Sequence, residues 1–248
     1  MYSRLDVFET KKSASTAVIS GVILTLLYKV WTYGGKELLG LSPQENYHNY
    51  ELFNTAFRYL GGVLAIILCF KLFKTKKIIS LNCSKLARNI LVSFLFLFFI
   101  IKVSLYRVSF SLKQFSFESL SNLSVGIWEE FAFKGLIMTG LCRFVGVKWS
   151  VFLTSLYFTL WHVDTYPSVE SLFHIFLIGF VFSLSYVIGC SLFFVSIAHF
   201  ILNQLHFGFI YLEGDDQLFS NLFTALEILT TLIFFRVYQI NKEKFKLR

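Results

Sequence analysis

The sequence predicts an all-α, polytopic membrane protein, and two observations carry that prediction. Of its 248 residues, 56% are hydrophobic and 19% aromatic, only 15% are charged, and the mean hydropathy is +0.65. An ordinary soluble domain is about one-quarter charged, so this composition is typical of a protein that lives in a bilayer. The apolar residues also occur in long uninterrupted runs, and about 20 such residues suffice for a helix to cross a membrane.

Eight apolar stretches are expected to form membrane-spanning helices. In chain order they cover about Ser13–Tyr33, Thr55–Phe73, Asn89–Leu105, Leu120–Phe144, Lys148–Val163, Leu172–Ile188, Ser191–Leu212 and Leu218–Tyr238. Residues 106–118 mix apolar and polar side chains, which favours an amphipathic helix lying at the membrane interface. Because neither a repeat nor a soluble segment is recognisable, residues 1–248 are expected to form a single integral-membrane domain.

The basic residues predict the orientation in the bilayer. The net charge of +8 comes from residues that cluster between apolar runs, where loops face anionic lipid, so nucleic-acid binding is not expected. The second connection carries six of them: Lys71, Lys74, Lys76, Lys77, Lys85 and Arg88. It is therefore expected in the cytoplasm, and an even number of spans puts both termini there as well, in a protein of the cell membrane.

The four cysteines suggest no structural cross-link. Cys69, Cys83, Cys142 and Cys190 are scattered through the chain without a CxxC pair. Neither a zinc ribbon nor a disulfide framework is therefore predicted.

The fourth apolar stretch carries the most informative polar residues. Glu129 and Glu130 are adjacent, and Lys134 follows Glu130 by four positions within an otherwise apolar, aromatic run. Ionised groups at membrane depth are costly and mark a candidate functional site. Glu130 and Lys134 have the favourable orientation for a helical ion pair, so we expect Lys134 to neutralise Glu130 and leave Glu129 for other partners.

Further polar residues interrupt the fifth and seventh stretches. His162 ends the fifth, while His199 and Asn203 share one face of the seventh because they are four residues apart. Glu129 lies 14 positions before Arg143, and His162 lies 14 positions after Lys148. Both would then lie roughly 21 Å from the cytoplasmic side, with His199 and Asn203 at roughly 12–18 Å. One site between the fourth, fifth and seventh helices is therefore predicted to hold all four residues.

These residue types suit the hydrolysis of an amide bond. A carboxylate and an imidazole can hold and deprotonate a water molecule, and a second histidine with an asparagine can stabilise an oxyanion. The alternative explanation is structural: an ion-pair site at the glutamates and interhelical hydrogen bonds from His199 and Asn203. His174 and His206 are interpreted as structural, with a supporting role open for His206.

The order and spacing of these motifs resemble a known family. Glu129-Glu130-x-x-x-Lys134, Phe158-x-x-x-His162 and His199-x-x-x-Asn203 are similar to the motifs of bacterial members of the CAAX protease and bacteriocin-processing (CPBP, Abi) family of intramembrane endopeptidases. The resemblance implies that Glu129 and His162 activate water while His199 and Asn203 stabilise the oxyanion, within a catalytic core at residues 120–212. The family pattern has Arg where this chain has Lys134, which keeps the charge and loses the bidentate fork.

The resemblance also shapes the expectations about cofactor and function. It implies a glutamate-activated water without a metal; if zinc is present, Glu129, His162 and His199 are its expected ligands. The predicted function is hydrolysis of a membrane-associated or secreted peptide or protein, in bacteriocin self-immunity or peptide maturation. The alternatives are a CAAX prenyl-protein endoprotease and a non-catalytic immunity or scaffold protein that binds a peptide or membrane partner. A small-solute transporter is disfavoured, because repeated halves and broken helices are not recognisable.

Overall fold

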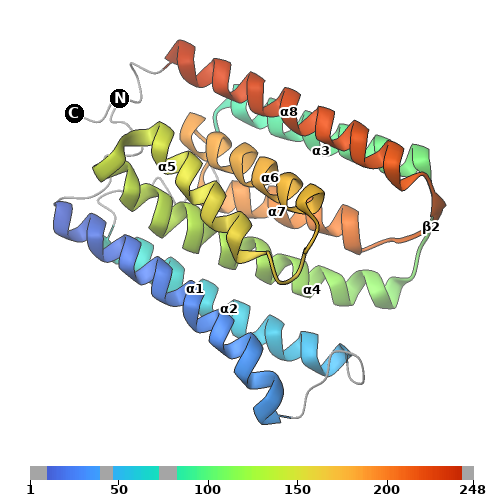
Figure 1. Cartoon of the computed structure of the whole chain (residues 1–248), viewed down its shortest axis with the longest axis horizontal. Coiled ribbons are helices and arrows are strands. Elements are labelled where there is room, and N and C mark those ends of the chain that lie inside the picture. Colours follow the sequence, from blue (N-terminus) through green and yellow to red (C-terminus); the bar gives the residue numbers. More distant parts are fainter. Residues whose placement is uncertain (1–9, 40–46, 73–82, 242–248) are drawn as a thin grey trace.

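The computed structural model describes residues 10–39, 47–72 and 83–241, and within these the chain is a helical bundle (Figure 1). The elements in chain order are α1 (Lys11–Leu39), α2 (Tyr47–Leu72), α3 (Lys85–Leu105), β1 (Tyr106–Ser109), α4 (Leu112–Glu129), the π-helix η2 (Glu130–Met138), α5 (Thr139–Trp161), α6 (Val169–Ile188), α7 (Leu192–Phe207), β2 (Ile210–Gly214) and α8 (Asp216–Asn241).

The predicted all-α, polytopic membrane fold is confirmed. Six of the described helices are long and apolar enough to cross a membrane, and α7 is a shorter apolar helix. The longest of the six, Leu112–Trp161, is interrupted at Gly146, whose φ of +75° is accessible to glycine and rarely to other residues. The chain turns back there, so that the second half of α5 packs against η2 (Figure 1). The predicted break between Phe144 and Lys148 therefore lies where the structure has one.

The helices pack so that α4 to α7 lie in the middle of the bundle. In Figure 1, α3 and α8 run side by side along one edge, and α1 and α2 run along the opposite edge. The start of α1 and the end of α8 lie at the same end of the bundle, as an even number of crossings requires. Which compartment this end faces remains a prediction, since Lys74, Lys76, Lys77 and the basic residues from Lys242 onward lie outside the described residues.

Residues 106–118 differ from the expected interfacial helix. Tyr106–Ser109 form the strand β1, which pairs antiparallel with β2, and the rest of the segment begins α4 at Leu112. The seventh predicted span also ends early, at Phe207, because residues 210–214 form β2. The two short strands satisfy each other's backbone groups, which an isolated extended segment beside a membrane could not do.

A lysine fixes this strand pair to the bundle. The Lys102 ammonium of α3 lies 4.8, 4.5 and 4.1 Å from the ring centroids of Tyr106, Tyr211 and Phe219. Cation–π contacts of this kind are favourable where the cation is desolvated, and Lys102 is buried. The contacts join α3, both strands and α8.

The expectation of no disulfide is wrong for one pair. Cys83, just before α3, is bonded to Cys190, between α6 and α7, while Cys69 and Cys142 are free and buried. The two partners are separated by 107 residues in the sequence. No local sequence spacing predicts such a pair, because the two cysteines come together only where the helix ends meet in the folded chain.

Candidate active site

The site is built on a close approach of α4 to α7. A Cβ added at Gly126 would lie 2.6 Å from the Ser196 carbonyl oxygen, so only glycine allows this contact. One turn earlier, the Asn122 amide donates a hydrogen bond of 3.0 Å to Gln204 Oε1. These contacts fix the two helices side by side and bring the residues after Gly126 opposite His199.

The two adjacent glutamates face different partners. Successive residues of a helix point about 100° apart, so neighbouring carboxylates diverge. The helix also changes character at this point, because Glu130–Met138 have π-helical hydrogen bonding, a feature often found at functional sites. The Thr139 hydroxyl donates to the Lys134 carbonyl oxygen at 2.7 Å and so compensates the altered backbone bonding. Glu129 faces the cavity described below, whereas Glu130 is completely buried.

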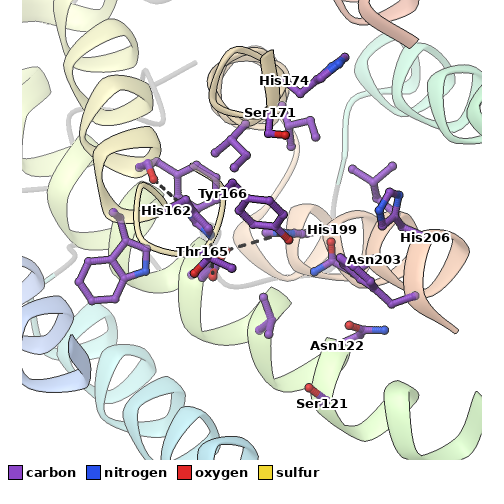
Figure 2. Close-up of a pocket in the computed structure, with 18 of the residues that line it drawn as sticks. Ser121, Asn122, His162, Thr165, Tyr166, Ser171, His174, His199, Asn203 and His206 are labelled. Carbon is purple, nitrogen blue, oxygen red and sulfur yellow. Dashed lines mark hydrogen bonds and ion pairs between the residues drawn. The ribbon is translucent and has the colours of Figure 1, made fainter. Parts of the chain in front are cut away.

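Glu129 lies between two imidazoles. Its Oε1 is 3.7 Å from His162 Nε2, at the end of α5, and its Oε2 is 3.8 Å from His199 Nε2, on α7. Figure 2 shows His162 and His199 in the same pocket, on different helical segments. Glu129 is 7% exposed, so its carboxylate is held in a mostly desolvated setting. The structure therefore brings together three residues that span 70 positions in the sequence, from Glu129 to His199.

The hydrogen bonds of the two imidazoles determine which nitrogen faces Glu129. His162 Nδ1 lies 2.8 Å from the Phe158 carbonyl oxygen, which can only accept, so Nδ1 carries a hydrogen and donates. His199 Nδ1 lies 2.9 Å from Glu130 Oε1 and donates to that carboxylate. Both Nε2 atoms are thus left for chemistry beside Glu129.

The predicted ion pair between Glu130 and Lys134 is present, and Glu130 has a further partner. Lys134 Nζ lies 3.0 Å from Glu130 Oε1, the same oxygen that accepts from His199 Nδ1. The Lys134 ammonium also lies 4.4 Å from the ring centroid of Phe158. Among the described residues, Glu130 Oε2 is buried without a hydrogen-bond partner. The sequence predicts only the ion pair of Glu130 with Lys134. In the structure, Glu130 also orients His199 through a hydrogen bond.

Asn203, Glu129 and its two neighbouring histidines line one cavity of about 1020 Å³. The Asn203 side chain forms no hydrogen bond with any described residue, so its amide is available to a ligand. Figure 2 shows it beside His199 on the same side of α7, as the four-residue spacing predicts. All four residues predicted for the site therefore lie around the same space.

The cavity wall also contains a buried charge cluster that the sequence did not single out. Arg58 of α2 donates a hydrogen bond of 2.5 Å to Glu51 Oε1 and one of 2.8 Å to the Tyr28 hydroxyl. Ser121 of α4 donates to the same Glu51 oxygen at 2.5 Å. Glu51 and Arg58 were not recognised as a pair because Glu51 lies before the predicted start of the second span at Thr55, whereas Arg58 lies three residues inside it. Their spacing of seven residues, two helical turns, was the available signal.

The loop between α5 and α6 covers the His162 side of the cavity. The Lys29 ammonium of α1 forms a 2.9 Å ion pair with Asp164 and lies 4.8 Å from the Trp161 ring centroid. The hydrogen bond donated by Tyr33, followed by that of Lys29, lowers the pKa of Asp164. Asp164 is therefore ionised at neutral pH, and the loop is fastened to α1.

The two remaining histidines of the helical core have different surroundings. His174 Nδ1 lies 2.7 Å from Glu227 Oε2, and its Nε2 lies 3.1 Å from the Ser220 hydroxyl, which joins α6 to α8. His206 lies against Phe98 and Phe207, with ring centroids 6.4 and 4.5 Å apart. Both line the cavity away from Glu129, in agreement with the structural role predicted for His174.

The donor set was also tested for a metal site. Among the described residues, no group of three or more His, Cys, Asp or Glu side chains is arranged to hold a metal ion. Glu129, His162 and His199, the expected zinc ligands, approach one another at 3.7 and 3.8 Å and leave one imidazole nitrogen each toward the carboxylate.

The comparisons with known proteins agree with this geometry. Residues 112–205 match the family model described as type II CAAX prenyl endopeptidase Rce1-like. The matched segment begins with α4 and ends within α7, and it contains Glu129, His162, His199 and Asn203. No curated protein and no solved structure shows a significant match to the chain. Residues 112–205 of this membrane protein are thus similar to the Rce1-like CAAX endopeptidases, which supports an intramembrane protease of the CPBP family.

Proposed function

We propose that Glu129 is the general base of a peptide-bond hydrolysis carried out inside the cavity. The observation that supports this role is the position of its carboxylate between His162 Nε2 and His199 Nε2, at 3.7 and 3.8 Å. At this separation the carboxylate and the His162 ring form no direct hydrogen bond, and a water on the cavity side of the pair could contact both groups. Desolvation and the adjacent imidazole make such a water easier to deprotonate.

In the proposed reaction, Glu129 takes a proton from the water and the resulting hydroxide attacks the scissile carbonyl carbon. The carbonyl oxygen becomes an oxyanion that accepts hydrogen bonds from the Asn203 amide and from His199 Nε2–H. Since His199 Nδ1 already donates to Glu130, donation from Nε2 as well requires a hydrogen on both ring nitrogens. Glu129 then returns its proton to the departing amine, and the peptide bond breaks.

We propose that the reaction needs no metal. A carboxylate with two correctly oriented imidazoles supplies the base and one oxyanion donor without a Lewis acid. The measurement is elemental analysis of the purified protein, together with activity after dialysis against a zinc chelator. Zinc at one equivalent per chain, with activity lost on chelation and regained on adding zinc, would overturn this part of the proposal.

The proposed substrate is a peptide segment of a membrane-associated or secreted protein. The cavity wall carries polar groups from several helices, among them Glu51 and Arg58 of α2, Glu170 of α6 and Ser220 of α8. Such groups suit the amides and polar side chains of an extended peptide. We propose peptide maturation or self-immunity against bacteriocins as the setting, in the cell membrane with both termini cytoplasmic.

The decisive experiment compares the wild-type protein with Glu129→Gln and His162→Ala in nanodiscs. Two internally quenched peptides of identical sequence are the probes, one with a prenylated C-terminal CAAX cysteine and one without the prenyl group. Loss of about 10² to 10⁴ in kcat is expected in both variants if these residues move protons. The ratio of the rates for the two peptides separates a prenyl-protein endoprotease from a peptidase of unmodified chains.

Glu227→Gln is the matched control. Glu227 is also a buried carboxylate of the bundle, but its hydrogen-bond partner is His174, which is not one of the residues proposed to react. Its kcat should stay within about threefold of the wild-type value, measured at equal amounts of folded protein. Equal cleavage by wild type and Glu129→Gln would exclude the proposed base.

A non-catalytic binding role is the second candidate, and the substitution at Lys134 is the observation that favours it. Lys134 reaches only one oxygen of Glu130 and leaves the other without a partner among the described residues. If the protein is a scaffold, the wild type and Glu129→Gln should protect a strain lacking the gene against bacteriocin equally well, at matched membrane levels. A peptidase would protect only as wild type.

A further inference from the structure

We infer that Tyr166, in the loop between α5 and α6, is a further catalytic residue whose phenol hydroxyl donates a hydrogen bond to the oxyanion. This inference rests on the proposed function and adds a third donor to the two that the sequence motifs suggest. The residue lies outside those motifs, on a segment that the helix prediction treated as a connection.

The loop holds Tyr166 in a fixed position next to His162. The backbone N–H of Tyr166 donates to the His162 carbonyl oxygen at 2.9 Å, and that of Thr165 donates to the same oxygen at 3.0 Å. Pro167 follows and restricts the backbone of the residue before it. The ion pair between Asp164 and Lys29 fastens the same loop to α1. Tyr166 and His162 are therefore positioned as one unit, and donors that are fixed in advance are the most effective in catalysis.

The ring extends from this loop into the cavity. Its centroid lies 6.1 Å from that of His162, and Tyr166 lines the same cavity as Glu129, His199 and Asn203. Figure 2 shows the hydroxyl end of the ring directed toward His199 and Asn203, the two residues proposed to hold the oxyanion.

The hydroxyl is free to act as a donor. It forms no hydrogen bond with any of the described residues, although the side chain is half-buried. Burial, and then the negative charge of Glu129, raises the pKa of Tyr166, which favours the neutral phenol. A phenol in this state does not compete with Glu129 as a base.

The chemistry gives the hydroxyl a definite task. When the hydroxide adds to the carbonyl carbon, the negative charge moves to the carbonyl oxygen, beside Asn203 and His199. A neutral O–H directed at that point stabilises the charge in the transition state more than the neutral carbonyl of the substrate. Its removal should therefore lower kcat and leave KM nearly unchanged.

The test is Tyr166→Phe, which keeps the ring and removes only the oxygen. With the quenched peptide that the wild-type protein cleaves in nanodiscs, kcat should fall by about 10²-fold while KM changes by less than about twofold. Tyr157→Phe is the matched control: it also removes a phenol oxygen, one bonded to Thr25 at 2.8 Å, but does not line the cavity. A peptide phosphonate of the same sequence, which imitates the tetrahedral intermediate, should bind Tyr166→Phe more weakly by a similar factor.

The outcomes separate this inference from the function on which it rests. If wild type cleaves the peptide, Glu129→Gln does not, and Tyr166→Phe is as fast as Tyr157→Phe, the inference is wrong and the peptidase mechanism stands. A rise in KM with unchanged kcat assigns Tyr166 to substrate binding only and also overturns it. If neither wild type nor Glu129→Gln cleaves or binds the probes, both the mechanism and the inference fall.

Discussion

Glu130 Oε1 lies 2.9 Å from His199 Nδ1 and 3.0 Å from Lys134 Nζ. One carboxylate oxygen therefore fixes the ring of a site histidine and at the same time compensates a fully buried ammonium. These two contacts offset part of the cost of burying the Glu130–Lys134 ion pair in the middle of a helical bundle.

Glu130→Gln should damage both stability and activity. The substitution leaves Lys134 buried without its counter-ion, which costs on the order of 3–5 kcal/mol when one partner of a buried pair is removed. It also releases His199 from its orientation, and a loss on the order of a hundredfold or more in kcat is expected, as for other carboxylates that orient a catalytic imidazole. Thermal unfolding in detergent and kcat at a temperature where the variant is folded measure the two effects. Wild-type kcat in folded Glu130→Gln would contradict the positioning role.

Lys134→Arg and Lys134→Met should have opposite consequences. Arginine has a planar fork that can bond both carboxylate oxygens, including Glu130 Oε2, which has no partner among the described residues. We expect Lys134→Arg to retain or raise thermal stability and kcat. Lys134→Met keeps the apolar stem and removes the charge, so unfolding should occur at a clearly lower temperature. Melting curves of both variants, recorded beside the wild type, decide the matter; equal destabilisation by Arg and Met would refute the argument.

The fastening of the α5–α6 loop should depend on pH. The pKa of Asp164 is lowered in the folded protein, so the ion pair with Lys29 stabilises the loop above the Asp164 pKa of the unfolded chain. This contribution is lost as the pH falls through the lowered pKa of the folded state. Asp164→Asn should therefore increase amide hydrogen exchange at residues 163–166 at neutral pH and have no effect at a pH below both values. A difference that persists at the acidic pH would show that the carboxylate charge is not the cause.

The His174–Glu227 contact should contribute to stability and not to the chemistry. Glu227 is fully buried and bonds to His174 across α6 and α8 at 2.7 Å. His174→Ala leaves this carboxylate without its hydrogen-bonded partner, which should cost about 1–3 kcal/mol or more. Chemical unfolding gives the loss of free energy, and kcat per folded molecule should remain near the wild-type value. A variant that is stable but inactive would move His174 into the catalytic machinery.

Part of the site could be predicted from the sequence because helical spacing is a local property. The residue pairs Glu130–Lys134 and His199–Asn203 are each four positions apart, which places their members on one helix face whatever the rest of the chain does. The matching distances of Glu129 and His162 from the basic residues near Gly146 likewise depend only on the rise per residue of a helix. Span length likewise predicted a break between Phe144 and Lys148, where Gly146 interrupts the helix, since an apolar run of this length cannot continue straight through a bilayer.

Tertiary structure alone decided the contacts between residues on different helices. The bond from His199 Nδ1 to Glu130 depends on the close approach of α4 to α7 at Gly126, and the Cys83–Cys190 bond depends on where two helix ends meet. The pairing of β1 with β2 joins segments about 100 residues apart, and the position of Tyr166 follows from a loop fastened to α1. Periodicity specifies which side of a helix a residue occupies, whereas the partner on the facing helix is set by packing, which is a property of the whole chain.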